Sequence, residues 1–253
     1  MTDFDIEQAL KEHKSALLYY MAYESSRELK DDLRAFEYLK MAQNYYDNYQ
    51  IDKDDLYFKI IYKTAKINFD RGELIKAFDN LITIPESLLT IEIIDLINNL
   101  LLMLDKKDEF FKYMELKEKL IETTSQKISF WQENINFFKN NDKTELNLAK
   151  ASLKLSNIEP NNDEFFYDFE ELKHNLSELE SKYKIIELYN KRAEVCSSEF
   201  EKGDLYYKIF KIAKDIDDKD TAYKSLKKGL EKSPKHKVLK LTYKKWIDDK
   251  KRY

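Results

Sequence analysis

Residues 63–81, KTAKINFDRGELIKAFDNL, decide the fold. Apolar and small side chains recur in this stretch at three- and four-residue intervals, which is the spacing of helices with one buried side. A polar turn around Gly72 interrupts the pattern once, with Ala65 before it, and Ala77 and Leu81 after it. The stretch therefore predicts two helices joined by a tight turn.

A second stretch, TAYKSLKKGLEKSP at 221–234, repeats this pattern near the other end of the chain, with Ala222, Leu226, Gly229 and Pro234 at its marked positions. Both stretches resemble the tetratricopeptide repeat. In that family small residues let two antiparallel helices approach closely, and a proline ends the chain segment before the next hairpin. A single hairpin cannot bury its apolar stripe, so the resemblance implies a stack of hairpins with one continuous core.

The same period extends along the chain. A small or apolar residue opens the second helix of each expected pair just after a polar turn, and successive spacings are 42, 33, 37, 38 and 37 residues. We call these the marker residues, and they are Ala35, Ala77, Phe110, Asn147, Ile185 and Ala222. The copies in the middle of the chain lack the alanines of the family pattern, so we expect the repeat to be irregular there.

Composition agrees with a helical chain. Only 3 Gly and 3 Pro occur in 253 residues, against a usual usage of roughly 7% and 5%, which argues against sheet folds with many hairpins and against Rossmann or P-loop folds. We expect an all-α, right-handed α-solenoid of about six hairpins, forming a single domain over 1–253. Its last part, 235–253, is expected to be a basic capping helix that covers the sixth hairpin.

The chain is expected to be cytoplasmic. Its first residues are acidic where a secretion signal would be basic and then apolar, and Cys196 is its only cysteine, which suits a reducing compartment. The most apolar stretch, Leu88 to Leu104, is interrupted by charged and amide side chains, so it predicts a buried helix and not a membrane anchor. We expect loops at the polar runs 140–143 and 159–164, and a hinge at one of these loops.

No catalytic constellation stands out, and we expect neither an enzyme nor a cofactor or metal. The three histidines, His13, His174 and His236, are far apart and show no metal-binding spacing. Cys196 lies late on an expected helix, which favours a buried, inert thiol. Paired aspartates fall where helix capping explains them, at Asp31 and Asp32, Asp54 and Asp55, and Asp217 and Asp218.

The resemblance places the binding groove of such a protein on the first helix of each hairpin. Aligning Ala65 with the family's small residue gives the groove positions of the second repeat, and the others follow from the period. They are Tyr20, Glu24, Tyr62, Lys66, Phe69, Asp95, Asn99, Gln132, Asn136, Glu170, His174, Tyr207, Lys211 and Lys214.

This mixture of tyrosine, acid and lysine suits a peptide segment or a partner helix, with aromatic anchors and polar contacts that set the register. The function predicted first is therefore a protein-binding scaffold or adaptor. Tyr62 and Lys66 stand where the family's carboxylate clamp would have Lys and Asn, so that clamp's ligand is not expected here. The alternative, that these positions are merely solvated surface, stays open.

A second function of another class rests on the basic end of the chain. Residues 224–253 hold twelve Lys or Arg against three acids, while the whole chain has a formal net charge of -4. Nucleic acid could bind here through phosphate contacts and base stacking, and KVLKLTYKKWIDDK at 237–250 faintly resembles the half-a-tetratricopeptide repeats of RNA-processing factors. The residues concerned are Lys237, Lys240, Lys244, Lys245 and Trp246. A peptide-sensing regulator ranks third, and self-association through an exposed solenoid end stays open.

Overall fold

The computed structural model describes residues 6, 9, 15–141 and 144–250, with the backbone alone at 107–108 and 249–250. All regular structure in this part of the chain is helical, as the composition predicts. The helices fall into two compact units, residues 1–121 and 122–253, and each is described by itself.

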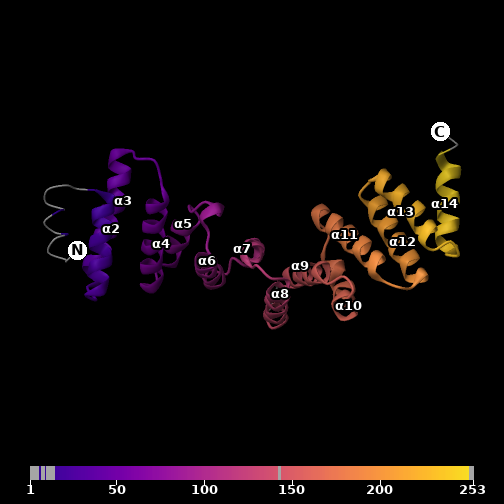
Figure 1. Ribbon diagram of the computed structural model, residues 1–253, viewed down its shortest axis with the longest axis horizontal. Helices are drawn as coiled ribbons and strands as arrows, with labels where there is room; N and C mark the ends of the chain where they lie inside the picture. Colours follow the sequence, from indigo (N-terminus) through magenta and orange to yellow (C-terminus); the bar gives the residue numbers. More distant parts are fainter. Residues whose placement is uncertain (1–5, 7–8, 10–14, 142–143, 251–253) are drawn as a thin grey trace. The chain divides into compact units, whose positions relative to one another are not determined.

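The described part of the first unit contains three helical hairpins that follow one another along the chain (Figure 1). In each hairpin the second helix packs against the first. They are α2 (Ala16–Glu28) with α3 (Asp32–Tyr49), α4 (Asp55–Asp70) with α5 (Leu74–Leu81), and α6 (Ile91–Met103) with α7 (Lys107–Leu120). A 3-10 turn, η1 (Glu86–Leu88), lies in the connection from α5 to α6.

The second unit continues the pattern with three more pairs and a final helix. Its elements are α8 (Thr124–Lys139), α9 (Glu145–Ile158), α10 (Asp163–Leu172), η2 (Lys173–Asn175), α11 (Leu179–Val195), α12 (Glu199–Asp215), α13 (Lys219–Lys232) and α14 (Lys237–Lys250). The described chain thus has the six pairs and the final helix that the period predicts, and each marker residue from Ala35 to Ala222 lies on the second helix of its pair. The run at 140–143 lies within the α8–α9 connection, and its residues 142–143 are outside the described part. The run at 159–164 covers the α9–α10 connection and the first two residues of α10.

Paired aspartates start helices, as expected. Asp31, Asp54 and Asp218 are the N-cap residues of α3, α4 and α13, and each accepts a hydrogen bond from the backbone N–H three residues later. Such a bond satisfies one of the donors left free in the first turn of a helix. For Asp54, the hydroxyl of Tyr46 donates a further hydrogen bond of 2.5 Å, and this bond holds the pKa of the carboxyl below its usual value.

The turns inside four hairpins share one backbone geometry. The residue five positions before the marker residue of the second helix has a positive φ, between 50° and 80°, in pairs one, two, three and six. The next residue donates its N–H to a carbonyl five residues back, as Glu73 does to Asn68 at 2.8 Å. This left-handed ending closes a helix within one residue. The four residues are Lys30, Gly72, Asp105 and Asp217.

The core of the first unit contains the row expected on α4 and one face of α6. Tyr57, Ile60, Ile61, Thr64 and Ala65 are all buried, as their spacing predicts. Within the apolar stretch, α6 supplies six buried residues, in agreement with the buried helix expected there. Across the described part of the chain, every helix is too short or too polar to cross a membrane.

In the second unit small residues sit where helices approach most closely. A Cβ built on Gly229 of α13 would lie 2.9 Å from Leu239 of α14, and one on Gly203 of α12 would lie 2.4 Å from the His236 ring. Leu239 is fully buried and His236 nearly so. The final helix therefore covers the sixth pair as a cap, which is the role predicted for it.

The fifth pair departs from the pattern, in agreement with the irregular middle repeats. The α10 helix has 10 residues and runs into η2, and α11 packs mainly on α9 and α12. Phe166 and Phe169 of α10 still reach the core next to Ile185 and Tyr189 of α11.

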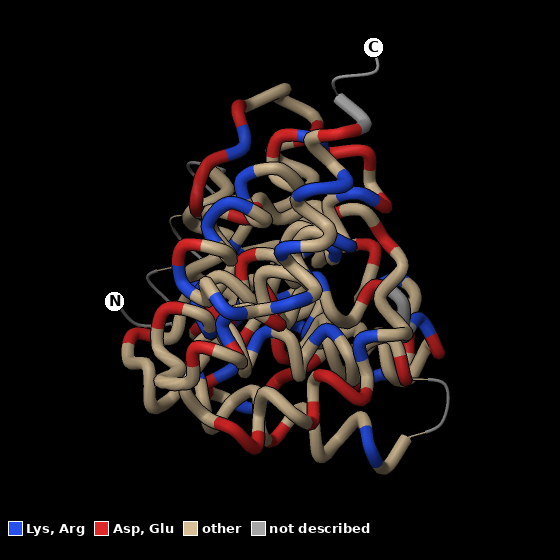
Figure 2. The backbone as a smooth tube through the Cα atoms, turned by 90° about the vertical axis from the view of Figure 1, so that its right-hand side faces the viewer, with Lys and Arg blue, Asp and Glu red and all other residues tan. Residues whose placement is uncertain are grey.

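Acidic and basic residues are interspersed along the backbone (Figure 2). Many form short-range pairs on one helix, such as Lys184 with Glu180 at 2.7 Å and Lys191 with Glu187 at 2.7 Å. These exposed pairs contribute little to stability and keep the helix surfaces solvated.

Candidate functional site

The groove positions expected on α2 are Tyr20 and Glu24, and Tyr20 packs beside a second tyrosine of the same helix. The Tyr20 ring lies 5.6 Å from the ring of Tyr23. Burial, followed by the hydrogen bond and charge of Glu24, raises the pKa of the Tyr20 phenol. Burial likewise raises the pKa of Tyr23, with a smaller contribution from Tyr62 on α4. The first helices of the first two hairpins therefore present neighbouring tyrosines.

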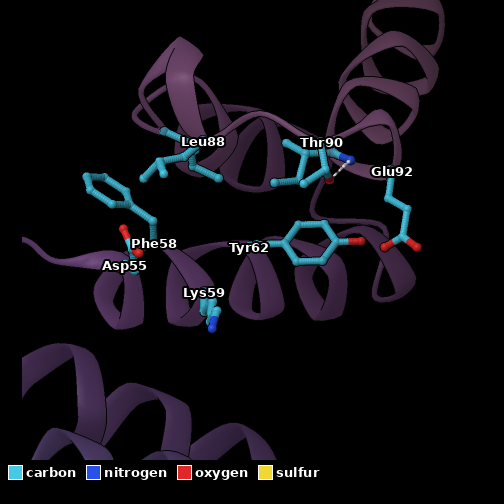
Figure 3. Close-up of a pocket in the computed structure, with 9 residues that line it drawn as sticks. Asp55, Phe58, Lys59, Tyr62, Leu88, Thr90 and Glu92 are labelled. Carbon is cyan, nitrogen blue, oxygen red and sulfur yellow. Dashed lines mark hydrogen bonds between the residues drawn. The ribbon is translucent and has the colours of Figure 1, made fainter. Parts of the chain in front are cut away.

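Tyr62 lines a pocket of about 280 Å³ between α4 and the start of α6. Figure 3 shows its ring lying along α4 opposite Thr90, with the hydroxyl directed toward Glu92 and with Phe58 and Leu88 on the other side of the pocket. We call this the Tyr62 pocket, and its lining residues are Asp55, Phe58, Lys59, Tyr62, Ile84, Leu88, Thr90, Glu92 and Ile93.

Local structure explains the shape of this pocket. Phe58 and Tyr62 are four residues apart on α4 and share one face. The opposite wall comes from η1 and from Thr90, the N-cap of α6, whose hydroxyl accepts the N–H of Ile93 at 3.4 Å. The pocket is therefore held by a helix on one side and a capped helix start on the other.

Two carboxylates stand at opposite ends of the Tyr62 pocket. Asp55 lies beside Phe58, and Glu92 lies beyond the Tyr62 hydroxyl (Figure 3). Burial raises the pKa of Tyr62, and the charge of Glu92 raises it further. Neither carboxylate forms an ion pair with another described side chain. The ammonium of Lys59 points away from Leu88 and Thr90 in Figure 3.

The remaining positions of the first unit behave differently. Lys66 and Asn99 are exposed, and Phe69 is half-buried. Asp95 forms an ion pair of 2.5 Å with Lys117 of α7, so its charge is already matched within its own hairpin. These four residues do not contribute to the pocket.

In the second unit, Gln132 and Asn136 of α8 line a wider pocket of about 480 Å³ against α10. We call it the Asn136 pocket. It lies between the first helices of two consecutive hairpins, as the Tyr62 pocket does. Its other lining residues are Ser129, Glu133, Ile135, Lys139, Leu155, Glu164, Phe165 and Asp168.

Glu170, another expected groove residue, is the centre of a polar network. Its carboxylate accepts hydrogen bonds from Lys173 at 2.7 Å, from Lys208 at 2.6 Å and from the Tyr189 hydroxyl. Burial alone would raise the pKa of Glu170, but these bonds outweigh it and leave the pKa below its usual value. Because its oxygens are occupied from α11 and α12, Glu170 joins three elements of the unit.

The expected residues of α12 form an aromatic surface with cations beside it. The Tyr207 ring stacks at 6.1 Å on Phe210, and the Lys211 ammonium lies 5.3 Å from the Tyr207 ring centre. Lys214 is exposed. His174 lies in η2 rather than on the helix, with Nδ1 2.8 Å from the carbonyl oxygen of Glu171.

Of the residues considered for nucleic-acid binding, the lysines are exposed and the tryptophan is partly buried. Lys237, Lys240, Lys244 and Lys245 are exposed on α14. Trp246 is partly buried and packs edge-on at 5.7 Å against Phe210, so its ring supports the cap of the unit. Arg252 lies outside the described residues.

Groups that could carry chemistry are few. Among the described residues there is no set of three His, Cys, Asp or Glu side chains placed to hold a metal. Cys196 follows α11 directly and is buried, and burial raises the pKa of its thiol. The burial of Cys196 agrees with the prediction made from its sequence position.

Sequence reasoning missed most of the Tyr62 pocket wall. Phe58 shares the face of Tyr62 one turn away, and this i, i+4 spacing was a usable signal. Leu88, Thr90 and Glu92 come from the connection between hairpins, where no periodicity predicts which side chains face the pocket.

Neither a family model nor a curated protein sequence matches the chain. Among solved structures, YrrB, described as a TPR protein with an unusual peptide-binding site, is similar over 95% of this chain and 97% of its own, at 13% identity and a TM-score of 0.37.

Two further solved structures are similar over comparable lengths. The C-terminal part of a TPR repeat-containing protein from Cytophaga hutchinsonii matches 94% of this chain and 91% of its own, at 14% identity and a TM-score of 0.38. A tetratricopeptide repeat protein from Parabacteroides merdae matches 92% and 98%, at 15% identity and a TM-score of 0.36. The chain's own helices, over the described residues, form an all-α succession of hairpins.

Proposed function

We propose that this protein is a non-enzymatic scaffold that holds a peptide segment or a helix of a partner protein against the first helices of its hairpins. The observation that carries the proposal is the Tyr62 pocket. It is lined by two aromatic rings and three aliphatic side chains, and it is large enough for one or two side chains of a partner.

The position of the pockets supports this use. The Tyr62 pocket lies between α4 and α6, and the Asn136 pocket lies between α8 and α10. In both units a hollow therefore opens between the first helices of consecutive hairpins. Tyrosine suits an anchor in such a hollow because it offers a large contact area at low entropic cost and keeps a hydroxyl for hydrogen bonding.

Site-specific photocrosslinking in the protein's own cells tests the proposal. A photoreactive phenylalanine analogue is placed at Lys66 of α4 or Lys211 of α12, and, as controls, at Lys76 of α5 or Lys227 of α13. All four positions are exposed. We expect protein adducts from the first-helix positions and none from the controls.

Two further experiments test whether the adducts depend on the Tyr62 pocket and whether they contain nucleic acid. Tyr62→Ala should abolish the adduct at position 66 while the thermal unfolding of the protein stays cooperative. Nuclease treatment should leave the adducts unchanged. Adducts that form equally from α5 and α13, or that contain nucleic acid, would contradict the proposal.

A further inference from the structure

We infer that the Tyr62 pocket takes a large apolar side chain that is flanked in the partner's sequence by lysine or arginine. The inference rests on the proposed function and specifies the chemistry of the partner. It follows from what the pocket walls contain and from the charges at its two ends.

The interior of the pocket selects an apolar side chain. Phe58 and Leu88 line one end from opposite walls, and the ring of Tyr62 forms the floor opposite Thr90 (Figure 3). The Thr90 hydroxyl already accepts the N–H of Ile93, and so it is engaged in capping α6. At about 280 Å³, the pocket is just below the range of roughly 300–1,000 Å³ that holds drug-sized ligands, so it suits a leucine, methionine or phenylalanine side chain.

The rim of the pocket selects positive charge beside that side chain. Asp55 and Glu92 stand at its two ends, and the ammonium of the one lining lysine, Lys59, is directed away. Both acids also lie in the first turn of a helix, where a negative charge is stabilised by the helix dipole. The site thus presents two carboxylates that a bound lysine or arginine can reach, while a bound acid would be repelled.

Peptide display measures this preference directly. A library of random twelve-residue peptides is selected on the whole protein and, in parallel, on Tyr62→Ala, and sequences retained only by the wild type are kept. We expect them to combine Leu, Met or Phe with Lys or Arg within two positions.

Synthetic copies of the retained peptides then test the two acids. Their affinity should fall about three- to tenfold when Asp55→Asn and Glu92→Gln are combined, since two partly exposed charge pairs are lost. Glu37→Gln with Asp79→Asn removes the same charge from α3 and α5, and it should leave affinity unchanged. Glu92→Lys is an exposed substitution that preserves folding and should turn the selection toward acidic peptides.

The outcomes separate the inference from the proposed function. Retained peptides that are acidic, or that show no charge preference, would overturn the inference while leaving the groove as a binding site. A library in which no peptide depends on Tyr62 would overturn both.

Discussion

Arg192 of α11 donates a hydrogen bond of 3.1 Å to the backbone carbonyl oxygen of Pro160, in the connection between α9 and α10. The same guanidinium bonds Asp163 at the start of α10 and, at 3.0 Å, Glu201 of α12. It also lies 4.9 Å from the centre of the Phe166 ring, and the side chain is only 6% exposed. One residue therefore ties α11 to α10, its partner in the irregular fifth pair, and to α12 of the sixth pair.

Arg192→Ala should lower the free energy of unfolding of the second unit by about 2–4 kcal/mol, because it removes a buried cation from several hydrogen bonds at once. Urea unfolding followed by circular dichroism measures the loss. Lys191→Ala is the matched control. Lys191 is exposed and pairs with Glu187 on its own helix, so its removal should cost at most about 0.5 kcal/mol. Equal losses for the two variants would show that Arg192 does not join these elements.

The repeated left-handed turn gives a second prediction. Lys30 and Asp217 occupy the conformation that Gly72 has in the second hairpin, and side chains other than glycine are strained there. Lys30→Gly and Asp217→Gly should each raise the free energy of unfolding by about 0.5–1 kcal/mol. Gly72→Ala should lower it by about 1 kcal/mol, although a Cβ there meets no atom within 4 Å. Thermal unfolding of the three single variants checks the signs, and a loss of stability in the glycine variants would refute the argument.

These turns also show how far the sequence leads. Gly72 predicts its own turn, whereas Lys30, Asp105 and Asp217 adopt the same conformation without glycine, and only their constant distance from the next marker residue relates them. The helical hairpins were predictable because each helix is marked by the spacing of apolar residues within its own sequence. The cap was predictable because a stack of hairpins must end on a covered face.

The candidate site was less predictable. Tyr62 was predicted as a groove residue from its spacing to Ala65, and it lines a pocket. Glu170 was predicted by the same period, but its carboxylate lies in an internal network of hydrogen bonds. Helical period places a residue on a face of its helix and does not say what the neighbouring hairpin brings to it. For the Tyr62 pocket that neighbour is a connection, with Leu88 and Thr90, which carries no period.

Close packing under the cap gives a third prediction. Gly229→Ala places a methyl group 2.9 Å from Leu239 and 2.8 Å from Tyr206, and this should cost about 1–3 kcal/mol despite alanine's better helix propensity. Leu239→Ala makes room for that methyl group, so Gly229→Ala should cost less in the Leu239→Ala background. A double-mutant cycle in urea measures the coupling. Additive losses would mean that α14 shifts away from α13 instead of resisting the added methyl group.

The Glu170 network makes stability depend on pH. Its hydrogen bonds hold the pKa of Glu170 below that of an unfolded glutamate, about 4.3, so the stabilisation is fully present above that value and is lost as pH falls through the lower folded pKa. Glu170→Gln should lower the free energy of unfolding by about 1–2 kcal/mol at pH 7, since the site is partly exposed. The difference between wild type and variant should shrink below about pH 4.

Urea unfolding at pH 7, 5, 4 and 3 measures this difference. Glu187→Gln, which removes a carboxylate from an exposed pair with Lys191, should show only a small difference throughout. If Glu170→Gln lowers the free energy of unfolding equally at pH 3 and pH 7, the stabilisation comes from packing of the side chain and not from its charge beside Lys173 and Lys208. In that case the network would pack α10 against α12 without drawing stability from ionisation.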